Sequence, residues 1–269
     1  MSKSTIATYG HGTHNDFVLV FDPEETLSIT TAQTAQICNR ITGIGADGLI
    51  RITRPNNQWF MDYRNADGSI AEMCGNGIRV MARYLVERGH QGEGIFAINT
   101  RDGVKHLRVP AVGDITVNMG QIRSEDGEIT VSSNGLVWNG YNISMGNPHA
   151  VVFVDSLEQV GSLKEEPVVR PKEEYPEGVN VEFVVFGEGR ELSMRVFERG
   201  VGETQSCGTG TCAVALAATL ARAQSLPAQW IINPPGGRLE VEIDAHQNAI
   251  LTGPAELIGD HDIARFLDA

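Results

Sequence analysis

Hydrophobic and polar positions alternate over short stretches along most of this chain, and turn residues separate one stretch from the next. Many of these stretches are rich in β-branched and aromatic residues, a pattern that predicts β-strands. The predicted strands are residues 16–22, 48–53, 58–64, 95–100, 150–155, 181–185, 192–198 and 239–243. Sheet is therefore expected to be distributed over the whole chain.

Three segments carry helical patterns instead. The first begins near Thr30, which can cap a helix together with Gln33, and continues to Ile41. The second covers residues 75–88 and stops at Gly89, a residue type that suits the position after a helix C-cap.

The third helical segment covers residues 208–223, and its part from residue 211 to residue 221 has no polar face. A helix that is apolar on every side is buried on every side. We therefore expect this helix to pass through the centre of a domain, with sheet wrapped around it.

The sequence also repeats itself weakly at an offset of 133 residues. The offset takes Cys74 to Cys207, and the segment 18–22 resembles the segment 151–155. Further pairs at this offset are Asp22 and Asp155, Gly77 and Gly210, Gly103 and Gly236, and Gly120 and Gly253. A constant offset near half of the 269 residues predicts two similar halves, residues 1–117 and 118–256.

The composition narrows the class of function. Apolar residues make up 41% and charged residues 20% of the chain, as in soluble globular proteins. A formal charge of −13 argues against a nucleic-acid or anionic-membrane partner, because such partners need a basic face. No stretch approaches the roughly 20 apolar residues of a membrane span, and the N-terminus lacks the apolar region of a signal peptide. A cytoplasmic location is expected.

Four cysteines are present: Cys38, Cys74, Cys207 and Cys212. In a reducing compartment they are not expected to form a disulfide scaffold, and their spacings do not fit a zinc site. We therefore expect no metal ion. A single cysteine is usually a small buried hydrophobic residue, and this interpretation applies to Cys38 and Cys212.

Cys74 and Cys207 differ because each opens a Cys-Gly-x-Gly turn directly before a predicted helix. A cysteine at a helix start lies near the positive end of the helix dipole, which favours the thiolate. The glycines let backbone N–H groups approach an anion, which a helix start also attracts. If the two halves face each other, both thiols converge on one substrate carbon.

That arrangement suits a 1,1-proton transfer at an amino-acid Cα. One sulfur removes the proton as thiolate, and the other delivers a proton from the opposite face as thiol. Backbone donors would stabilise the charge that develops on the carboxylate. A phosphate site is the alternative for the Gly-rich turns, but neither turn has a P-loop or dinucleotide pattern.

A pyridoxal-phosphate enzyme would need a Schiff-base lysine. The only lysines are Lys3, Lys105, Lys164 and Lys172, and all are expected in polar or terminal surroundings. No cofactor is therefore expected.

At these residues the sequence resembles the diaminopimelate epimerases. The segments 65–69 and 73–79 match the first cysteine motif of that family, and the segments 198–204 and 207–210 match the second. Further matches are residues 15–18, 43–48, 145–149 and 178–180. The motifs span residues 11 to 237, so the resemblance covers the whole chain.

The resemblance implies a fold, an activity and roles for individual residues. The implied fold is α/β, with two pseudo-symmetric domains. Each domain is a mixed, mostly antiparallel sheet around a central helix. The resemblance places the site in the interdomain cleft and residues 257–269 in the first domain. The activity is interconversion of LL- and meso-diaminopimelate in lysine and peptidoglycan precursor biosynthesis, in a homodimer. Cys74 and Cys207 correspond to the acid–base pair, and His149 and Glu198 to residues that tune the thiols. The substrate-binding residues implied are Asn15, Asn65, Gly75, Asn76, Asn147, Asn180, Glu198, Arg199, Gly208 and Thr209.

Two positions depart from the family pattern. His14 stands where the family usually has glycine, and Gly48 stands where some members have a glutamine that contacts the site. Both departures concern the distal part of the substrate pocket. The nearest rival is a proline racemase or hydroxyproline epimerase, whose second cysteine motif lacks the run at residues 198–204. A non-enzymatic binder of an amino acid or phosphate is a rival of another class, but it gives no reason for two thiols.

Overall fold

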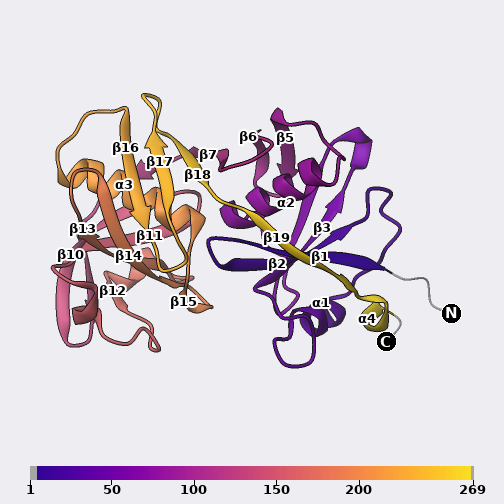
Figure 1. The fold of residues 1–269 in the computed structure, drawn as a ribbon. Coiled ribbons are helices and arrows are strands. Elements are labelled where there is room, and N and C mark those ends of the chain that lie inside the picture. Colours follow the sequence, from indigo (N-terminus) through magenta and orange to yellow (C-terminus); the bar gives the residue numbers. More distant parts are fainter. Residues whose placement is uncertain (1–4, 268–269) are drawn as a thin grey trace. The chain divides into compact units, whose positions relative to one another are not determined.

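The computed structural model describes residues 5–267, so the outermost residues of the first predicted domain, 1–4 and 268–269, lie outside the described part. The chain forms two compact units: Met1–Val117 together with Gly253–Ala269, and Asn118–Thr252. Each unit combines one sheet system with one long, buried helix (Figure 1).

The first unit has a mixed sheet in the order β19–β1–β2–β3–β4–β5–β6–β7. The pairs β2–β3 and β4–β5 are parallel, and the others are antiparallel. The helix α2 (Gly75–Glu87) packs against several of these strands and is buried from Gly75 to Leu85. The strands are β1 (Ile6–Gly12), β2 (Asn15–Phe21), β3 (Gly48–Thr53), β4 (Phe60–Asn65), β5 (Gly94–Thr100), β6 (Gly103–Val109), β7 (Ile115–Gln121) and β19 (Glu256–Asp262).

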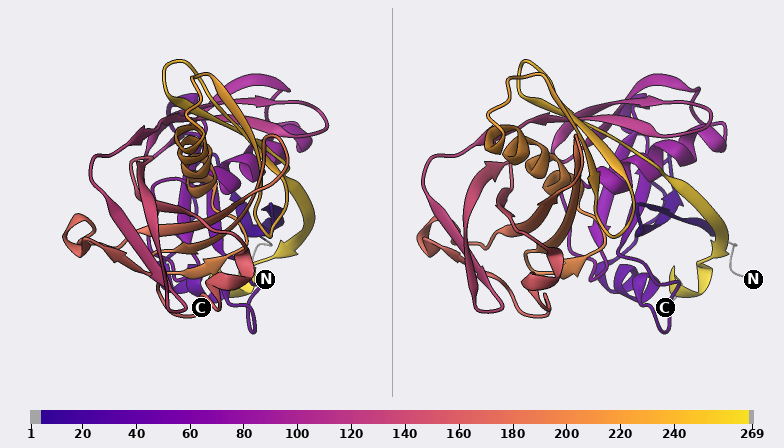
Figure 2. Two further views of the ribbon diagram at one scale, coloured as in Figure 1. Left: turned by 90° about the vertical axis from the view of Figure 1, so that its left-hand side faces the viewer. Right: turned by 60° about the vertical axis from the view of Figure 1, so that its left-hand side comes forward.

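The second unit repeats this plan in the order β9–β10–β11–β13–β14–β16–β17–β18. Its parallel pairs are β11–β13 and β14–β16, and the central helix is α3 (Gly208–Ala221), which Figure 2 shows with strands around it. The strands are β9 (Ile129–Ser133), β10 (Leu136–Ser144), β11 (Pro148–Phe153), β13 (Asn180–Phe186), β14 (Glu191–Glu198), β16 (Ala228–Asn233), β17 (Leu239–Ile243) and β18 (Asn248–Gly253).

Shorter elements complete both units. In the second unit β8 (Arg123–Ser124), β12 (Val168–Arg170) and β15 (Gly202–Thr204) pair with β10, β9 and β14, respectively. In the first unit the helices are α1 (Thr31–Cys38) and α4 (Ala264–Leu267). Short 3-10 turns are Pro55–Asn57, Leu157–Val160 and Lys172–Glu174.

The repeat seen in the sequence is therefore a repeat of structure. The offset of 133 takes Gly75, where α2 begins, to Gly208, where α3 begins. The pairing of β19 with β1 corresponds to the pairing of β9 with β10, so a strand from the C-terminal end completes the first sheet. The predicted fold class, two similar α/β halves each built around a helix, is confirmed.

Two helix predictions need correction in detail. The first helix begins at Thr31, with Thr30 and Gln33 forming the predicted capping box, but it ends at Cys38 and not at Ile41. The Asn39 side chain accepts hydrogen bonds from the backbone N–H groups of Ile41 and Thr42, and this turn replaces the helix. The third helix ends at Ala221, two residues earlier than predicted.

The apolar third helix is buried as predicted, but α2 is equally buried although it carries two arginines. Arg79 is fully buried and binds the carbonyl of Gly75 and the side chain of Asn76. Arg83 donates to three carbonyls of the segment after β6. Each guanidinium is therefore satisfied by oxygen atoms within the first unit. Within the described residues, every helix is too short or too polar to cross a lipid bilayer.

Candidate active site

Cys74 is the N-cap residue of α2 in the first unit. Its backbone is extended, with φ −137° and ψ 121°, and its sulfur accepts a hydrogen bond from the Gly77 N–H at 3.4 Å. The sulfur thus takes the place that a serine or aspartate oxygen usually occupies at a helix start. A thiolate in this position is stabilised by the helix dipole and by the backbone N–H.

Asn15 joins the Cys74 turn to the sheet. Its side-chain oxygen lies 3.5 Å from the Cys74 sulfur and 3.2 Å from the Asn76 amide nitrogen. Its amide nitrogen donates to Asp47 at 2.7 Å. The first residue of β2 and the first turn of α2 therefore share one polar network, and this network brings Asn15, Cys74 and Asn76 together.

Three charged residues, Asp16, Arg40 and Asp47, support that network. Arg40 bridges the carboxylates of Asp16 and Asp47 at 2.8 and 2.7 Å. Burial alone would raise the pKa of Asp16, but hydrogen bonds from Arg40, Tyr9 and the Asp47 N–H lower it below its usual value. The Asp16 carboxylate is thus held ionised, and Asp47 orients the Asn15 amide by accepting its hydrogen bond.

Asn65, also expected to bind substrate, lies at the end of β4 opposite Gly48. Its amide donates to Ser69 in the tight turn that follows, and no hydrogen bond links it to Cys74 in the described chain. Gly48 pairs with Asn65, and a Cβ there would lie 2.6 Å from the Arg64 carbonyl oxygen. A glutamine at residue 48 would therefore require this part of the sheet to shift.

The other departure from the family pattern, His14, lies in the turn between β1 and β2. Its φ is +59°, in the region that glycine adopts most easily. The histidine is exposed and packs edge-on against His11, with ring centroids 5.6 Å apart. The position thus keeps the backbone conformation for which glycine is suited.

Cys207 is the N-cap residue of α3 in the second unit, with φ −122° and ψ 118°. Its environment differs from that of Cys74, because it is buried among carboxylates. Burial raises the pKa of the Cys207 thiol well above its usual value, and the charges of Glu198 and Glu182 add to this shift. Burial also raises the pKa of Glu198, while interactions with Thr204 and Cys207 oppose that shift. The protonated thiol is therefore the favoured form of Cys207.

A chain of hydrogen bonds connects Cys207 to the sheet. The sulfur lies 3.5 Å from the Thr209 hydroxyl, which accepts from the Asn147 amide at 3.3 Å. The Asn147 oxygen lies 3.1 Å from Nε2 of His149, and Nδ1 of His149 lies 2.7 Å from Glu182. His149 and Glu182 are both fully buried. Four predicted site residues, Cys207, Thr209, Asn147 and His149, thus belong to one network.

Asn180 and Arg199 form a second contact in this unit. The Asn180 oxygen accepts from the backbone N–H of Arg199 at 3.1 Å, and its amide donates to the Pro148 carbonyl. In residues 5–267, no carboxylate lies within ion-pair distance of the Arg199 guanidinium. A group of this kind is suited to a ligand carboxylate.

Comparison with known proteins identifies the family. A family model described as diaminopimelate epimerase matches residues 7–124 and, again, residues 141–258. The chain belongs to this family. It is 46% identical to the diaminopimelate epimerase of Streptomyces coelicolor over 277 residues, which covers 97% of this chain and 96% of the relative.

Solved structures show how widely the fold of this family is shared. A phenazine biosynthesis protein of Bacillus anthracis superposes with a TM-score of 0.74 at 15% identity, over 97% of this chain and 99% of that one. A hydroxyproline epimerase from Agrobacterium vitis superposes with a TM-score of 0.69 at 16% identity, over 96% and 92%. At these identities the likeness concerns the fold alone.

The main residue missed in the sequence is Glu182. It lies on β13, where Val181 and Phe183 on either side are also buried. The available signal was a single acidic residue within an otherwise apolar strand, two positions after Asn180. Asp16, Arg40 and Asp47 behind Asn15 were also missed, because residues far apart in sequence form that cluster.

The remaining cysteines and lysines mostly follow expectation. Cys38 and Cys212 are buried in the cores of their units, as predicted. Lys105 has a largely buried side chain, but its ammonium group is ion-paired with Asp102 at 2.7 Å, so its surroundings are polar as predicted. Lys3 lies outside the described residues. Among residues 5–267, no cluster of three or more His, Cys, Asp or Glu side chains is arranged to hold a metal ion.

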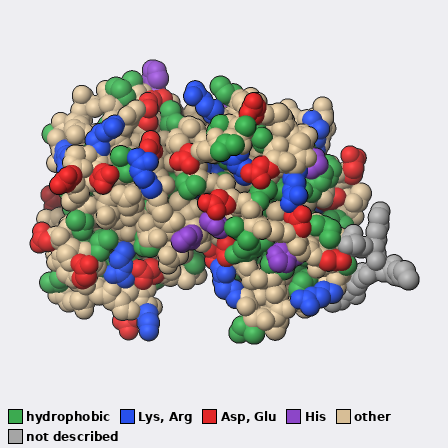
Figure 3. All heavy atoms as spheres, in the orientation of Figure 1, with side chains coloured by type: hydrophobic (Ala, Val, Ile, Leu, Met, Phe, Trp, Pro, Cys, Tyr) green, Lys and Arg blue, Asp and Glu red, His purple; other side chains and the backbone are tan. Residues whose placement is uncertain are grey.

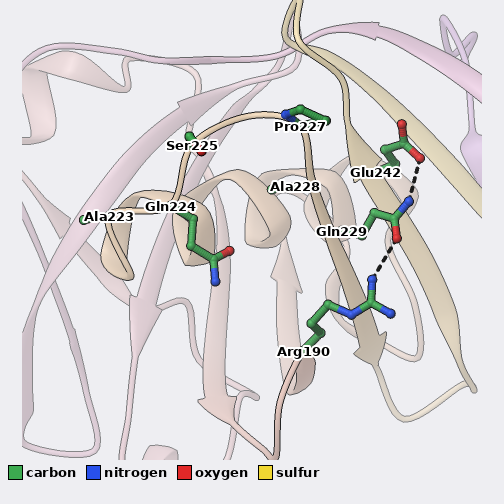
Figure 4. A pocket seen from close by; sticks show the side chains of 8 residues that line it. All are labelled: Arg190, Ala223, Gln224, Ser225, Pro227, Ala228, Gln229 and Glu242. Carbon is green, nitrogen blue, oxygen red and sulfur yellow. Dashed lines mark hydrogen bonds between the residues drawn. The ribbon is translucent and has the colours of Figure 1, made fainter.

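A hollow on the second unit lies elsewhere, beside the segment after α3. It has a volume of about 620 Å³, and its polar groups bind one another: Arg190 donates to Gln229, and Gln229 donates to Glu242 (Figure 4). None of the predicted site residues lines it. On the face shown in Figure 3, acidic and basic side chains are interspersed.

Proposed function

We propose that this protein interconverts LL- and meso-2,6-diaminopimelate by moving the Cα proton between Cys74 and Cys207. The observation that carries the proposal is that both cysteines cap repeat-related, buried helices in a chain of the diaminopimelate epimerase family. The different surroundings of the two sulfurs add support. The Cys74 sulfur lies next to the Gly77 N–H and the Asn15 amide oxygen, whereas the Cys207 sulfur lies near Glu198 and Glu182, whose charges add to the rise in its pKa that burial causes.

In the proposed step the substrate Cα lies between the two sulfurs. For one stereoisomer, the Cys74 thiolate takes the Cα proton, and the electron pair of the C–H bond delocalises onto the α-carboxylate. Cys207 gives its thiol proton to the opposite face of Cα, which leaves Cys74 as thiol and Cys207 as thiolate. The reverse reaction uses the same groups with their roles exchanged, so no net proton is consumed.

The proposed binding groups divide between the carboxylates and the ammonium groups of the substrate. The N–H groups at the starts of the two helices, from Gly75, Asn76, Gly208 and Thr209, would hold the α-carboxylate where negative charge develops. Arg199 provides a planar fork for the distal carboxylate. The amide oxygens of Asn15, Asn65, Asn147 and Asn180, together with Glu198, are suited to ammonium groups.

The reaction needs no group beyond these side chains, so we propose a cofactor-independent enzyme. Its place would be the biosynthesis of lysine and of peptidoglycan precursors in the cytoplasm. We propose, in addition, that the active protein is a homodimer and that both cysteines act on one substrate molecule. His149 and Glu198 would adjust the thiol at Cys207, to which the network connects them.

Replacement of each cysteine tests the proton transfer. We expect Cys74→Ala and Cys207→Ala each to lower inversion of diaminopimelate at least about 1000-fold, because each removes one of the two proton-transferring groups. Turnover in deuterium oxide, followed by mass spectrometry, should place solvent deuterium at Cα with the wild-type protein. The matched control is Cys38→Ala, which should remain active because Cys38 lies in the core. Normal inversion by Cys207→Ala would contradict the proposal.

Removal of metal ions and a change of substrate test the chemistry and the specificity. After exhaustive chelation, and without added pyridoxal phosphate, turnover of diaminopimelate should be unchanged. Proline should be turned over poorly, because it lacks a distal ammonium and carboxylate for Arg199 and the asparagines. Activity that disappears on chelation and returns with one added metal would contradict the cofactor-independent mechanism.

A further inference from the structure

Glu182 is a buried acidic residue for which the proposed mechanism has no role so far. One carboxylate oxygen lies 2.7 Å from Nδ1 of His149, and the other is buried without a hydrogen-bond partner in the described part of the chain. A Cβ on Gly210 would lie 2.5 Å from the first oxygen and 3.3 Å from the Cys207 Cβ. The carboxylate therefore lies directly against the first turn of α3, next to the residue that precedes it.

The hydrogen-bond partners of His149 fix the orientation of its ring. Each ring nitrogen faces an oxygen, that of Glu182 on one side and that of Asn147 on the other. The contacts continue from the Asn147 amide to the Thr209 hydroxyl and from that hydroxyl to the Cys207 sulfur. Glu182 is therefore connected to the second thiol through His149 as well as through its position against Gly210.

We propose that Glu182 is a positioning residue for the second thiol: it fixes the His149 ring and places a negative charge against the helix start that carries Cys207. The inference rests on the proposed function, because it gives Cys207 the role of a proton donor. A negative charge at this distance opposes formation of a thiolate and so keeps the donor proton in place. The raised pKa of Cys207, to which burial contributes most and Glu198 and Glu182 next, agrees with this role.

The position in the first unit that is related by the repeat to Glu182 carries no carboxylate. The repeat offset of 133 relates Glu182 to Leu49, which is buried among apolar residues. A Cβ on Gly77, the counterpart of Gly210, would meet Ile50, Met61 and Phe17. The two helix starts thus differ in charge: a carboxylate lies against the first turn of α3, and apolar side chains lie at the matching position of α2.

The test is the pH dependence of alkylation at Cys207. Purified full-length protein is treated with iodoacetamide between pH 6 and 11, and modification of each cysteine is followed by peptide mass spectrometry. The titratable groups that face Cys207 are Glu198, Glu182 and His149, from β14, β13 and β11. In Glu182→Gln, which keeps the shape but loses the charge, we expect the midpoint for Cys207 to fall by about one pH unit. At a pH below both midpoints, alkylation should be about tenfold faster.

Turnover gives a second measurement. Because Glu182 is fully buried and contacts His149, we expect Glu182→Gln to lower kcat for diaminopimelate and to leave KM nearly unchanged. The matched control is Glu191→Gln, an exposed glutamate at the start of β14, which should change neither the midpoint nor kcat. An unchanged or raised Cys207 midpoint in Glu182→Gln, or an equal fall in Glu191→Gln, would overturn the inference.

If Glu182→Gln does not fold, Glu182→Asp takes its place. The shorter side chain draws the charge away from Gly210, so the midpoint should still fall, by less than in Glu182→Gln. A Cys207 midpoint equal to that of the wild type would overturn the inference in this variant too. Alkylation needs no substrate, so its outcome is independent of whether diaminopimelate is the compound turned over.

Discussion

At the scale of single residues, some members of the candidate site could be predicted from sequence motifs and others could not. Cys74 and Cys207 could be singled out from the sequence, because the same glycine context follows both and a helix follows each. Glu182 could not be singled out in the same way, since a lone glutamate in a strand is equally consistent with a solvated face. Only the packing of β13 under α3 buries it against Gly210.

Arg199 gives a prediction at this scale. Its backbone N–H is held by Asn180, and its guanidinium has no carboxylate partner in residues 5–267, so the fold does not depend on the charge. Arg199→Lys replaces a planar, two-pronged donor by a point charge. We expect kcat/KM for diaminopimelate to fall about 100-fold, with an unchanged thermal midpoint.

The matched control for Arg199→Lys is Arg238→Lys. Arg238 is exposed and pairs with Glu240 at 2.8 Å, so its replacement should leave both kcat/KM and the thermal midpoint as they are. If Arg199→Lys kept near-normal kcat/KM, Arg199 would have no part in binding the distal carboxylate.

At the scale of secondary-structure elements, the hydrophobic pattern predicts the positions of strands more accurately than the turns that carry site residues. The predicted strands 48–53 and 239–243 agree with β3 and β17 residue for residue. The end of the first helix was missed, because the Asn39 side chain competes with the helix for backbone N–H groups. Local apolar spacing contains no information on that competition.

The turn after β4 supports a prediction about such an element. Gly68 has φ +84°, and a Cβ there would lie 2.3 Å from the Thr31 carbonyl oxygen. Gly68→Ala therefore combines an unfavourable backbone conformation, about 1–2 kcal/mol, with a steric overlap of about 1–3 kcal/mol. We expect the free energy of unfolding in urea to fall by about 2–5 kcal/mol.

Gly103 provides the control for Gly68. Its φ is +79°, but nothing lies within 4 Å of a Cβ built there. Gly103→Ala should therefore cost only the backbone contribution, about 1–2 kcal/mol. Equal losses in the two variants would show that the contact with Thr31 relaxes easily, and the turn that carries Asn65 would then be less rigid than the structure indicates.

For the whole molecule, the sequence repeat predicts two similar halves, but it does not predict how the charges in the two halves differ. The offset of 133 relates the starts of the two central helices, α2 and α3, one in each half. The charges under the two helices come from strands in which sequence similarity is weak, with Leu49 in one half and Glu182 in the other. The repeat therefore predicts the arrangement of the backbone, and the residues that differ between the halves determine which charges lie next to each helix start.

The buried titratable groups also predict how stability depends on pH on the alkaline side. Burial, with a contribution from Asp16 and Asp47, raises the pKa of Cys38 to about 12. In the unfolded chain the thiol loses its proton near its ordinary pKa, about 8.5. Between these values the unfolded state is deprotonated while the folded state keeps its proton. The free energy of unfolding therefore falls as pH rises through this window, by at most about 1.4 kcal/mol per pH unit for one group.

Cys38→Ala isolates this contribution. At pH 8 the variant should be less stable than the wild type, because the substitution leaves a small cavity in the core. Between pH 9 and pH 11 its free energy of unfolding should decline less steeply, by about 1.4 kcal/mol per pH unit. Some decline should remain, because Tyr9 and Tyr175 have pKa values raised to about 12, mainly by burial, and both stay in the variant. Urea unfolding followed by circular dichroism at half-unit steps of pH measures both slopes. Parallel curves for the two proteins would mean that Cys38 ionises in the folded state as readily as in the unfolded chain.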